Sequence, residues 1–167
     1  MQPVVLVKPK VYVETTVVSY LTARPSRDLV VAAHQQLTRE WWEQRRSDFE
    51  LFVSALVMQE AGFGDEQLAQ RRLNELAGIP VLALTEDAAA LANDLTEYGP
   101  LPKKAIEDAL HIAMATVYGM DYLLSWNCRH LANAEIEHAL ASKCMSRGYD
   151  PPIICTPEEL MGGEYTK

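Results

Sequence analysis

The sequence lacks any apolar run of the roughly 20 residues that a membrane span requires, and its first ten residues, MQPVVLVKPK, lack a signal-peptide cleavage pattern. We therefore expect a soluble, cytoplasmic protein with no membrane association. Cysteine is scarce, and the three present lack metal-type spacing, so we expect reduced packing residues. We find no repeat, low-complexity tract or interdomain linker. A chain of 167 residues, 49% of them hydrophobic, should form one domain over residues 1–167.

Positive charge is also scarce, with 15 Lys and Arg against 23 Asp and Glu and a formal net charge of −8. This balance argues against an extended basic surface for nucleic acid, because phosphate binding depends mainly on Lys and Arg. It does not exclude a nuclease. Carboxylates that hold divalent ions add negative charge, and the bound ions reverse the local sign where a phosphate must lie. Net charge alone therefore does not decide the function.

Hydrophobic periodicity predicts short strands that alternate with helices. The expected strands cover residues 10–14, 49–53, 81–84, 122–126 and 153–155. The expected helices cover 29–46, a segment that Ser54 caps and that carries Glu60, 65–76, a segment from Thr85 to Tyr98, 103–118 and 133–147. Thr156 to Glu159 also has the residues of a capping box. This alternation favours an α/β fold in three layers, with a mainly parallel sheet flanked by helices.

Four polar residues occupy positions from which a common site can form. Glu14 ends the first strand, Asn127 follows the fourth, Asp108 lies early on a helix, and Glu60 lies on the helix after the second strand. Ligands of parallel sheets bind beyond the carboxyl ends of the strands. If these ends converge, three carboxylates and an amide offer oxygen ligands to Mg²⁺ or Mn²⁺. Spacing alone favours the simpler interpretation that each is a solvated surface group.

Three segments resemble the PIN-domain family of VapC-like ribonucleases, whose members cleave RNA with Mg²⁺ or Mn²⁺. The segments are VYVETTVVSYL, FELFVSALVMQEAG and AIEDALHIAMATVYGMDYLLSWNCRHL, and the similarity spans about residues 11–160. By position, Glu14, Glu60 and Asp108 match the family's acidic residues, and Asn127 matches its fourth site. The resemblance implies a PIN-like three-layer fold, catalytic and metal-binding roles for these four residues, an antitoxin partner and a homodimer.

The chain departs from the family pattern at two positions. The family usually has aspartate at the first and commonly at the fourth position, where this chain has Glu14 and Asn127. Glutamate adds a methylene to the reach of its carboxylate, whereas asparagine keeps an oxygen ligand and loses a charge. These departures point to weaker metal binding or altered activity.

Other polar residues near the four have two interpretations. Ser125 and Arg129 flank Asn127, where a hydroxyl and a guanidinium can orient an RNA phosphate, although surface polarity explains them equally well. His111 follows Asp108 by one helical turn and is more simply a packed structural histidine than a group that contacts phosphate or metal. We expect like-charge repulsion to raise the pKa of at least one carboxylate when metal is absent.

Our hypothesis is a metal-dependent endoribonuclease, the toxin of a toxin–antitoxin pair, with Mg or Mn as cofactor and RNA as substrate. The alternative is a non-catalytic PIN-like module that binds RNA or protein through a weakened metal site. A metal-dependent phosphatase is a third reading, but the first strand ends in Glu14-Thr15-Thr16 and not in an aspartyl nucleophile motif of the D-x-D kind.

Overall fold

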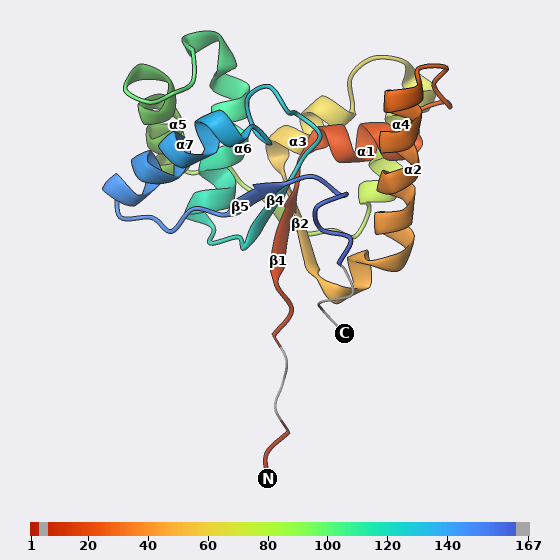
Figure 1. Ribbon diagram of the computed structural model, residues 1–167, viewed down its shortest axis with the longest axis horizontal. Coiled ribbons are helices and arrows are strands. Elements are labelled where there is room, and N and C mark those ends of the chain that lie inside the picture. The colour runs from red at the N-terminus through yellow and green to blue at the C-terminus, as the bar shows by residue number, and fades with distance from the viewer. Residues whose placement is uncertain (4–6, 163–167) are drawn as a thin grey trace.

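A computed structural model describes residues 1–3 and 7–162 and contains a five-stranded sheet in the order β3-β2-β1-β4-β5 (Figure 1). Every pair of neighbouring strands is parallel. The strands are β1 Lys10–Val13, β2 Glu50–Ser54, β3 Val81–Leu82, β4 Tyr122–Leu124 and β5 Ile153–Cys155. The predicted parallel α/β arrangement is therefore confirmed. Within the described residues, no helix combines the length and apolar character needed to cross a membrane.

Seven helices and two short 3₁₀ turns connect the strands within the described part of the chain. The helices are α1 Thr15–Thr22, α2 Leu29–Gln44, α3 Ala55–Ala61, α4 Glu66–Leu76, α5 Glu86–Glu97, α6 Ile106–Val117 and α7 Ala134–Ser146; the 3₁₀ turns are Arg46–Asp48 and Lys103–Ala105. Figure 1 shows α1 to α4 gathered on one side of the sheet and α5 to α7 on the other. The sheet is thus the middle of three layers.

β1 is the central strand, and three of its four residues have apolar or aromatic side chains that suit this buried position. Val11, Tyr12 and Val13 are all fully buried, as expected for a parallel strand covered on both faces. Tyr12 pairs with Phe52 of β2 on one side and with Leu123 of β4 on the other. Because β1 lies between these two strands, the carboxyl ends of all three meet at one edge of the sheet.

Side-chain caps fix the starts of several helices where the sequence predicted them. Ser54 accepts a hydrogen bond from the N–H of Val57 at the start of α3, and Thr85 does the same for α5. Such caps contribute about 1 kcal/mol each to helix stability. The predicted capping-box contacts between Thr156 and Glu159 are also confirmed, and the segment that they close is a turn within the described residues.

Candidate active site

Glu14 lies between the last residue of β1 and the first residue of α1, and its carboxylate caps that helix. Its side chain accepts a hydrogen bond from the N–H of Thr16 at 3.1 Å, and its own N–H donates to the carbonyl of Leu124 at the end of β4. Glu14, and not one of the two threonines that follow it, is thus the N-cap residue of α1. The residue is only 4% exposed. The first candidate carboxylate is therefore fixed by the junction of a central strand and a helix.

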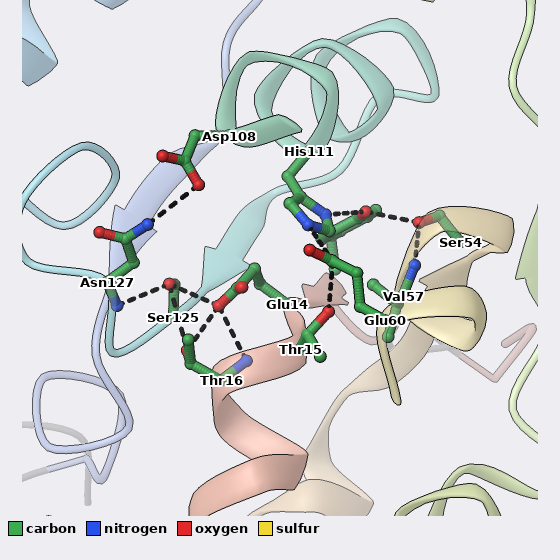
Figure 2. A network of polar contacts seen from close by, with 11 residues as sticks. Glu14, Thr15, Thr16, Ser54, Val57, Glu60, Asp108, His111, Ser125 and Asn127 are labelled. Carbon is green, nitrogen blue, oxygen red and sulfur yellow. Dashed lines mark hydrogen bonds and ion pairs between the residues drawn. The ribbon is translucent and has the colours of Figure 1, made fainter. Parts of the chain in front are cut away.

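The hydrogen bonds that the Glu14 carboxylate accepts from the described residues all go to one oxygen, Oε2 (Figure 2). Besides the N–H, the hydroxyls of Thr16 and Ser125 donate to Oε2, the latter at 2.8 Å. These two hydroxyls in turn accept the N–H groups of Trp126 and Asn127, each at 2.9 Å. Glu14 thereby fastens the loop after β4 to the start of α1.

Glu60 lies on α3 and is held from two directions. The hydroxyl of Thr15 donates to its Oε1 at 2.7 Å, and Nε2 of His111 on α6 lies 2.6 Å from the same oxygen. Burial alone would raise the pKa of Glu60, but the contacts with His111 and Thr15 lower it by more, so the pKa lies below its ordinary value. The pKa of Glu60 is therefore shifted in the direction opposite to the one that we expected from like-charge repulsion.

Asp108 lies in the first turn of α6 and is bonded at both oxygens. Nδ2 of Asn127 donates to Oδ1 at 3.0 Å, and Nδ1 of His130 lies 2.8 Å from Oδ2. The Asn127 amide is oriented by its own loop, since its oxygen accepts the N–H groups of Arg129 and His130 at 3.2 Å each. The amide nitrogen of Asn127 therefore faces Asp108, and its oxygen faces the backbone.

The four predicted residues lie along one network, as Figure 2 shows. Thr15, which bonds Glu60, is adjacent in sequence to Glu14; Ser125 bonds both Glu14 and the N–H of Asn127; and Asn127 bonds Asp108. The network contains side chains from α1, α3, α6 and the loop after β4. Convergence at the carboxyl edge of the sheet is thus present in the structure, whereas the metal-binding and catalytic roles of the four residues stay predictions.

The donor chemistry of the network suits a hydrated oxygen-loving ion. Oε1 of Glu14 and Oε2 of Glu60 accept no hydrogen bond from the described residues. Neither oxygen is sealed from solvent, because among the described residues the one buried side-chain polar atom without a partner is Nε of Arg45. In the same part of the chain, no three His, Cys, Asp or Glu side chains form a ready metal cage. Mg²⁺ commonly keeps several waters and uses only one or two carboxylates, so the residues fit such an ion.

The two residues proposed to bind substrate lie in different environments. Ser125 is fully buried, and its hydroxyl is engaged with Glu14 and the Asn127 N–H. Arg129 is exposed on the loop. The structure therefore gives Ser125 contacts that orient other residues of the site, and leaves the Arg129 side chain at the surface.

Sequence reasoning missed several members of the network. Tyr12 contacts His111 from within the core, and His130 contacts Asp108 across 22 positions of sequence. The pattern Glu14-Thr15-Thr16 held a signal for the two threonines, because hydroxyls next to a strand-end carboxylate are placed to bond it. The sequence around His130 held no comparable signal.

A separate apolar cavity of about 350 Å³ lies between α6, α7 and β5. Residues lining it include Ile112, Leu140, Cys144 and Ile154. It shares no lining residue with the network around Glu14. The lining also includes Glu137 and His138, but one carboxylate is not the cluster of oxygen ligands that a divalent ion requires, so the polar network is the better candidate for chemistry.

The family comparison agrees with this arrangement. The PIN domain family model matches residues 11–134, which include all four predicted site residues. No curated protein sequence is similar to the chain at a significant level.

Solved structures with a similar fold include the following two. One is VapBC2 from Rickettsia felis bound to a DNA fragment from its promoter, with 13% identity, a TM-score of 0.56 and coverage of 88% of this chain and 98% of that chain. The other is VapC20 from Mycobacterium tuberculosis, a sarcin–ricin loop cleaving toxin, with 15% identity, a TM-score of 0.56 and coverage of 72% and 92%. At these identities the likeness shows the fold alone. Since the family model spans most of the chain, this chain belongs to the PIN domain family.

Proposed function

We propose that the chain is a Mg²⁺- or Mn²⁺-dependent endoribonuclease and the toxin of a toxin–antitoxin pair. The observation that supports this most is the network in which Glu14 and Glu60 each have one oxygen fixed by hydrogen bonds and one that no described residue bonds, beside Asp108. Carboxylates restrained in this way are prepared to bind a hydrated divalent ion with little further ordering.

The residues have distinct proposed roles. Glu14, Glu60 and Asp108 hold the ion directly or through water, and Asn127 orients Asp108. When bound, the ion lowers the pKa of a coordinated water and stabilises the negative charge that develops on the phosphodiester. Thr16 and Ser125 keep the Glu14 carboxylate in one rotamer and fix the loop that carries Asn127.

RNA as substrate and an antitoxin protein as partner are proposed from family membership and the similar solved structures. One of these is a VapBC assembly, and the other is a toxin that cleaves the sarcin–ricin loop. A homodimer is proposed on the family resemblance. The formal net charge of −8 makes a bound cation more necessary here, since a phosphate otherwise meets a negative surface.

The alternative is a non-catalytic PIN-like module that binds RNA or protein. The orientation of Asn127 supports this second candidate, because its amide nitrogen pairs with Asp108 and its oxygen is taken by the loop. A site with this pairing binds metal less readily than one with a fourth carboxylate.

Cleavage of RNA by the purified protein with Mg²⁺, Mn²⁺ or EDTA distinguishes the two candidates. A nuclease should cleave only with metal, and Asp108→Asn should reduce the rate at least about 100-fold, because it removes a charge from the metal site. The matched control is Asp87→Asn, at an exposed position in the first turn of α5, which should cleave like the unaltered protein. RNA binding without metal-dependent cleavage would favour the alternative. Undiminished cleavage by Asp108→Asn, with contaminating nuclease excluded, would show that the catalytic centre lies elsewhere.

A further inference from the structure

A chain of hydrogen bonds runs from the start of α3 through the core to Glu60. The N–H of Val57 donates to Oγ of Ser54 at 3.1 Å, and this oxygen lies 2.7 Å from the hydroxyl of Tyr12. The same hydroxyl lies 2.7 Å from Nδ1 of His111, whose Nε2 lies 2.6 Å from Oε1 of Glu60. The chain therefore links a backbone donor at one end to a carboxylate at the other.

The two ends determine the direction of the protons along this chain. At one end the Val57 N–H can only donate; at the other, an ionised carboxylate can only accept. If Ser54 donates to Tyr12 and Tyr12 donates to Nδ1 of His111, every proton has an acceptor and the imidazole is neutral with its proton on Nε2. The opposite direction leaves the Ser54 hydroxyl proton without an acceptor among the described residues. Complete pairing thus selects one tautomer.

Burial makes this selection energetically significant. Tyr12 is fully buried and His111 is 1% exposed, and their rings pack edge to face with centroids 5.8 Å apart. Leaving a buried polar group without its partner is destabilising, so the fully paired arrangement is favoured over one with an orphaned proton. Burial also raises the pKa of the Tyr12 phenol, which keeps the hydroxyl proton that the chain requires.

We propose that His111 is a positioning residue for Glu60 and that Tyr12 and Ser54 set its tautomer. The proposal rests on the proposed function, because it takes Glu60 as a metal ligand. His111 and Thr15 both bond Oε1, which leaves Oε2 of Glu60 available. A flexible glutamate restrained at one oxygen loses less side-chain freedom when the other oxygen binds an ion.

The tautomer can be tested in the metal-free protein by ¹⁵N NMR of the histidine rings. The chain contains four histidines, and the His111 signals are those absent from His111→Gln. We expect the proton on Nε2 and a bare Nδ1 at neutral pH. Tyr12→Phe removes the donor to Nδ1 and should shift the spectrum toward a mixture of tautomers. A proton on Nδ1 in the unaltered protein would overturn the proposal.

Mn²⁺ affinity, measured by calorimetry, tests the effect on Glu60. His111→Leu removes the donor and should weaken binding about 10- to 100-fold, as loss of a group that orients a metal ligand typically does. His111→Gln places an amide N–H near the position of Nε2 and should recover most of that loss. Controls are Tyr118→Phe, whose hydroxyl bonds the carbonyl of Ala83, and Thr116→Val, a buried site on the same helix. Both should bind Mn²⁺ like the unaltered protein.

The outcomes separate this inference from the proposed function. Mn²⁺ binding without RNA cleavage by the unaltered protein would refute the nuclease, while the affinity series would still decide the role of His111. Metal-dependent cleavage with equal Mn²⁺ affinity in His111→Leu and the unaltered protein would refute the positioning role and leave the nuclease intact. Absence of Mn²⁺ binding by the unaltered protein would refute both. Where cleavage occurs, kcat should fall in His111→Leu with little change in KM, and unfolding midpoints identify any variant that fails to fold.

Discussion

Replacing Asn127 with aspartate turns a hydrogen bond of the site into a repulsion. In the unaltered protein Nδ2 of Asn127 donates to Oδ1 of Asp108 at 3.0 Å. Asn127→Asp leaves two carboxylates in contact with no proton between them. Because the neighbouring N–H groups of Arg129 and His130 hold the other oxygen in place, the new carboxylate keeps the orientation of the amide.

The size of the effect follows from this geometry. Two unit charges 4 Å apart repel by about 4 kcal/mol at an effective dielectric constant of about 20, and a hydrogen bond to a charged group contributes about 1.5–3 kcal/mol. The two effects overlap, and Asp108 is 23% exposed, so water screens part of the repulsion. We expect the metal-free variant to lose about 3 kcal/mol of unfolding free energy at pH 7.

A divalent ion should reverse this loss, because a fourth carboxylate strengthens its binding. An ion at 100 times its dissociation constant adds about 2.7 kcal/mol, which nearly cancels the expected deficit. Urea unfolding with EDTA and with Mn²⁺ measures both quantities. The control is Asn74→Asp, which makes the same charge change at an exposed position on α4, where the side-chain oxygen accepts a hydrogen bond from Gln70 and a carboxylate can do the same. If metal-free Asn127→Asp is as stable as the unaltered protein, the assigned contact with Asp108 is wrong.

Three further variants test other parts of the site. Because the pKa of Glu60 is lowered from its ordinary value of 4.5, its ionised form stabilises the metal-free fold above that pH, and this contribution disappears as the pH falls through the lowered pKa. In denaturant titrations Glu60→Gln should therefore be less stable than the unaltered protein at pH 7, and the difference should shrink as the pH falls below 4.5. Ser54→Ala should cost about 1–2 kcal/mol and more than Asp65→Ala, since both caps are lost but only Ser54 also bonds the core. Ser125→Ala should speed amide exchange at Asn127 by removing the acceptor of its N–H, and unchanged exchange would contradict that contact.

The sequence predicted the fold and the convergence of the four residues because both depend on simple periodic signals. The buried run of β1 followed by Glu14 indicates a strand that ends at a carboxylate, and the apolar spacing along α6 places Asp108 at its first turn. In a parallel sheet these ends meet at one edge whatever the detailed packing. The Ser54 and Thr85 caps were predictable for the same reason, since a cap is local.

The contacts within the site were not predictable, because they depend on rotamers and on pairs far apart in sequence. In the sequence Tyr12 looks like an ordinary core residue of a strand. Only the packing of α6 brings His111, 99 positions away, to its hydroxyl. The orientation of Asn127 depends on two N–H groups of the following turn, which sequence spacing does not reveal. Predicting which atom of Asn127 faces Asp108 therefore required coordinates.

The central place of β1 has a consequence for synthesis of the chain. β1 is made first among the strands, yet one of its two neighbours is β4, and Glu14 gains its Ser125 contact across 111 positions. A nascent chain therefore cannot assemble the network until the segment after β4 has left the ribosome. If the protein is a ribonuclease, its activity cannot appear during most of its own translation. During that interval an antitoxin could bind the chain before its site is assembled.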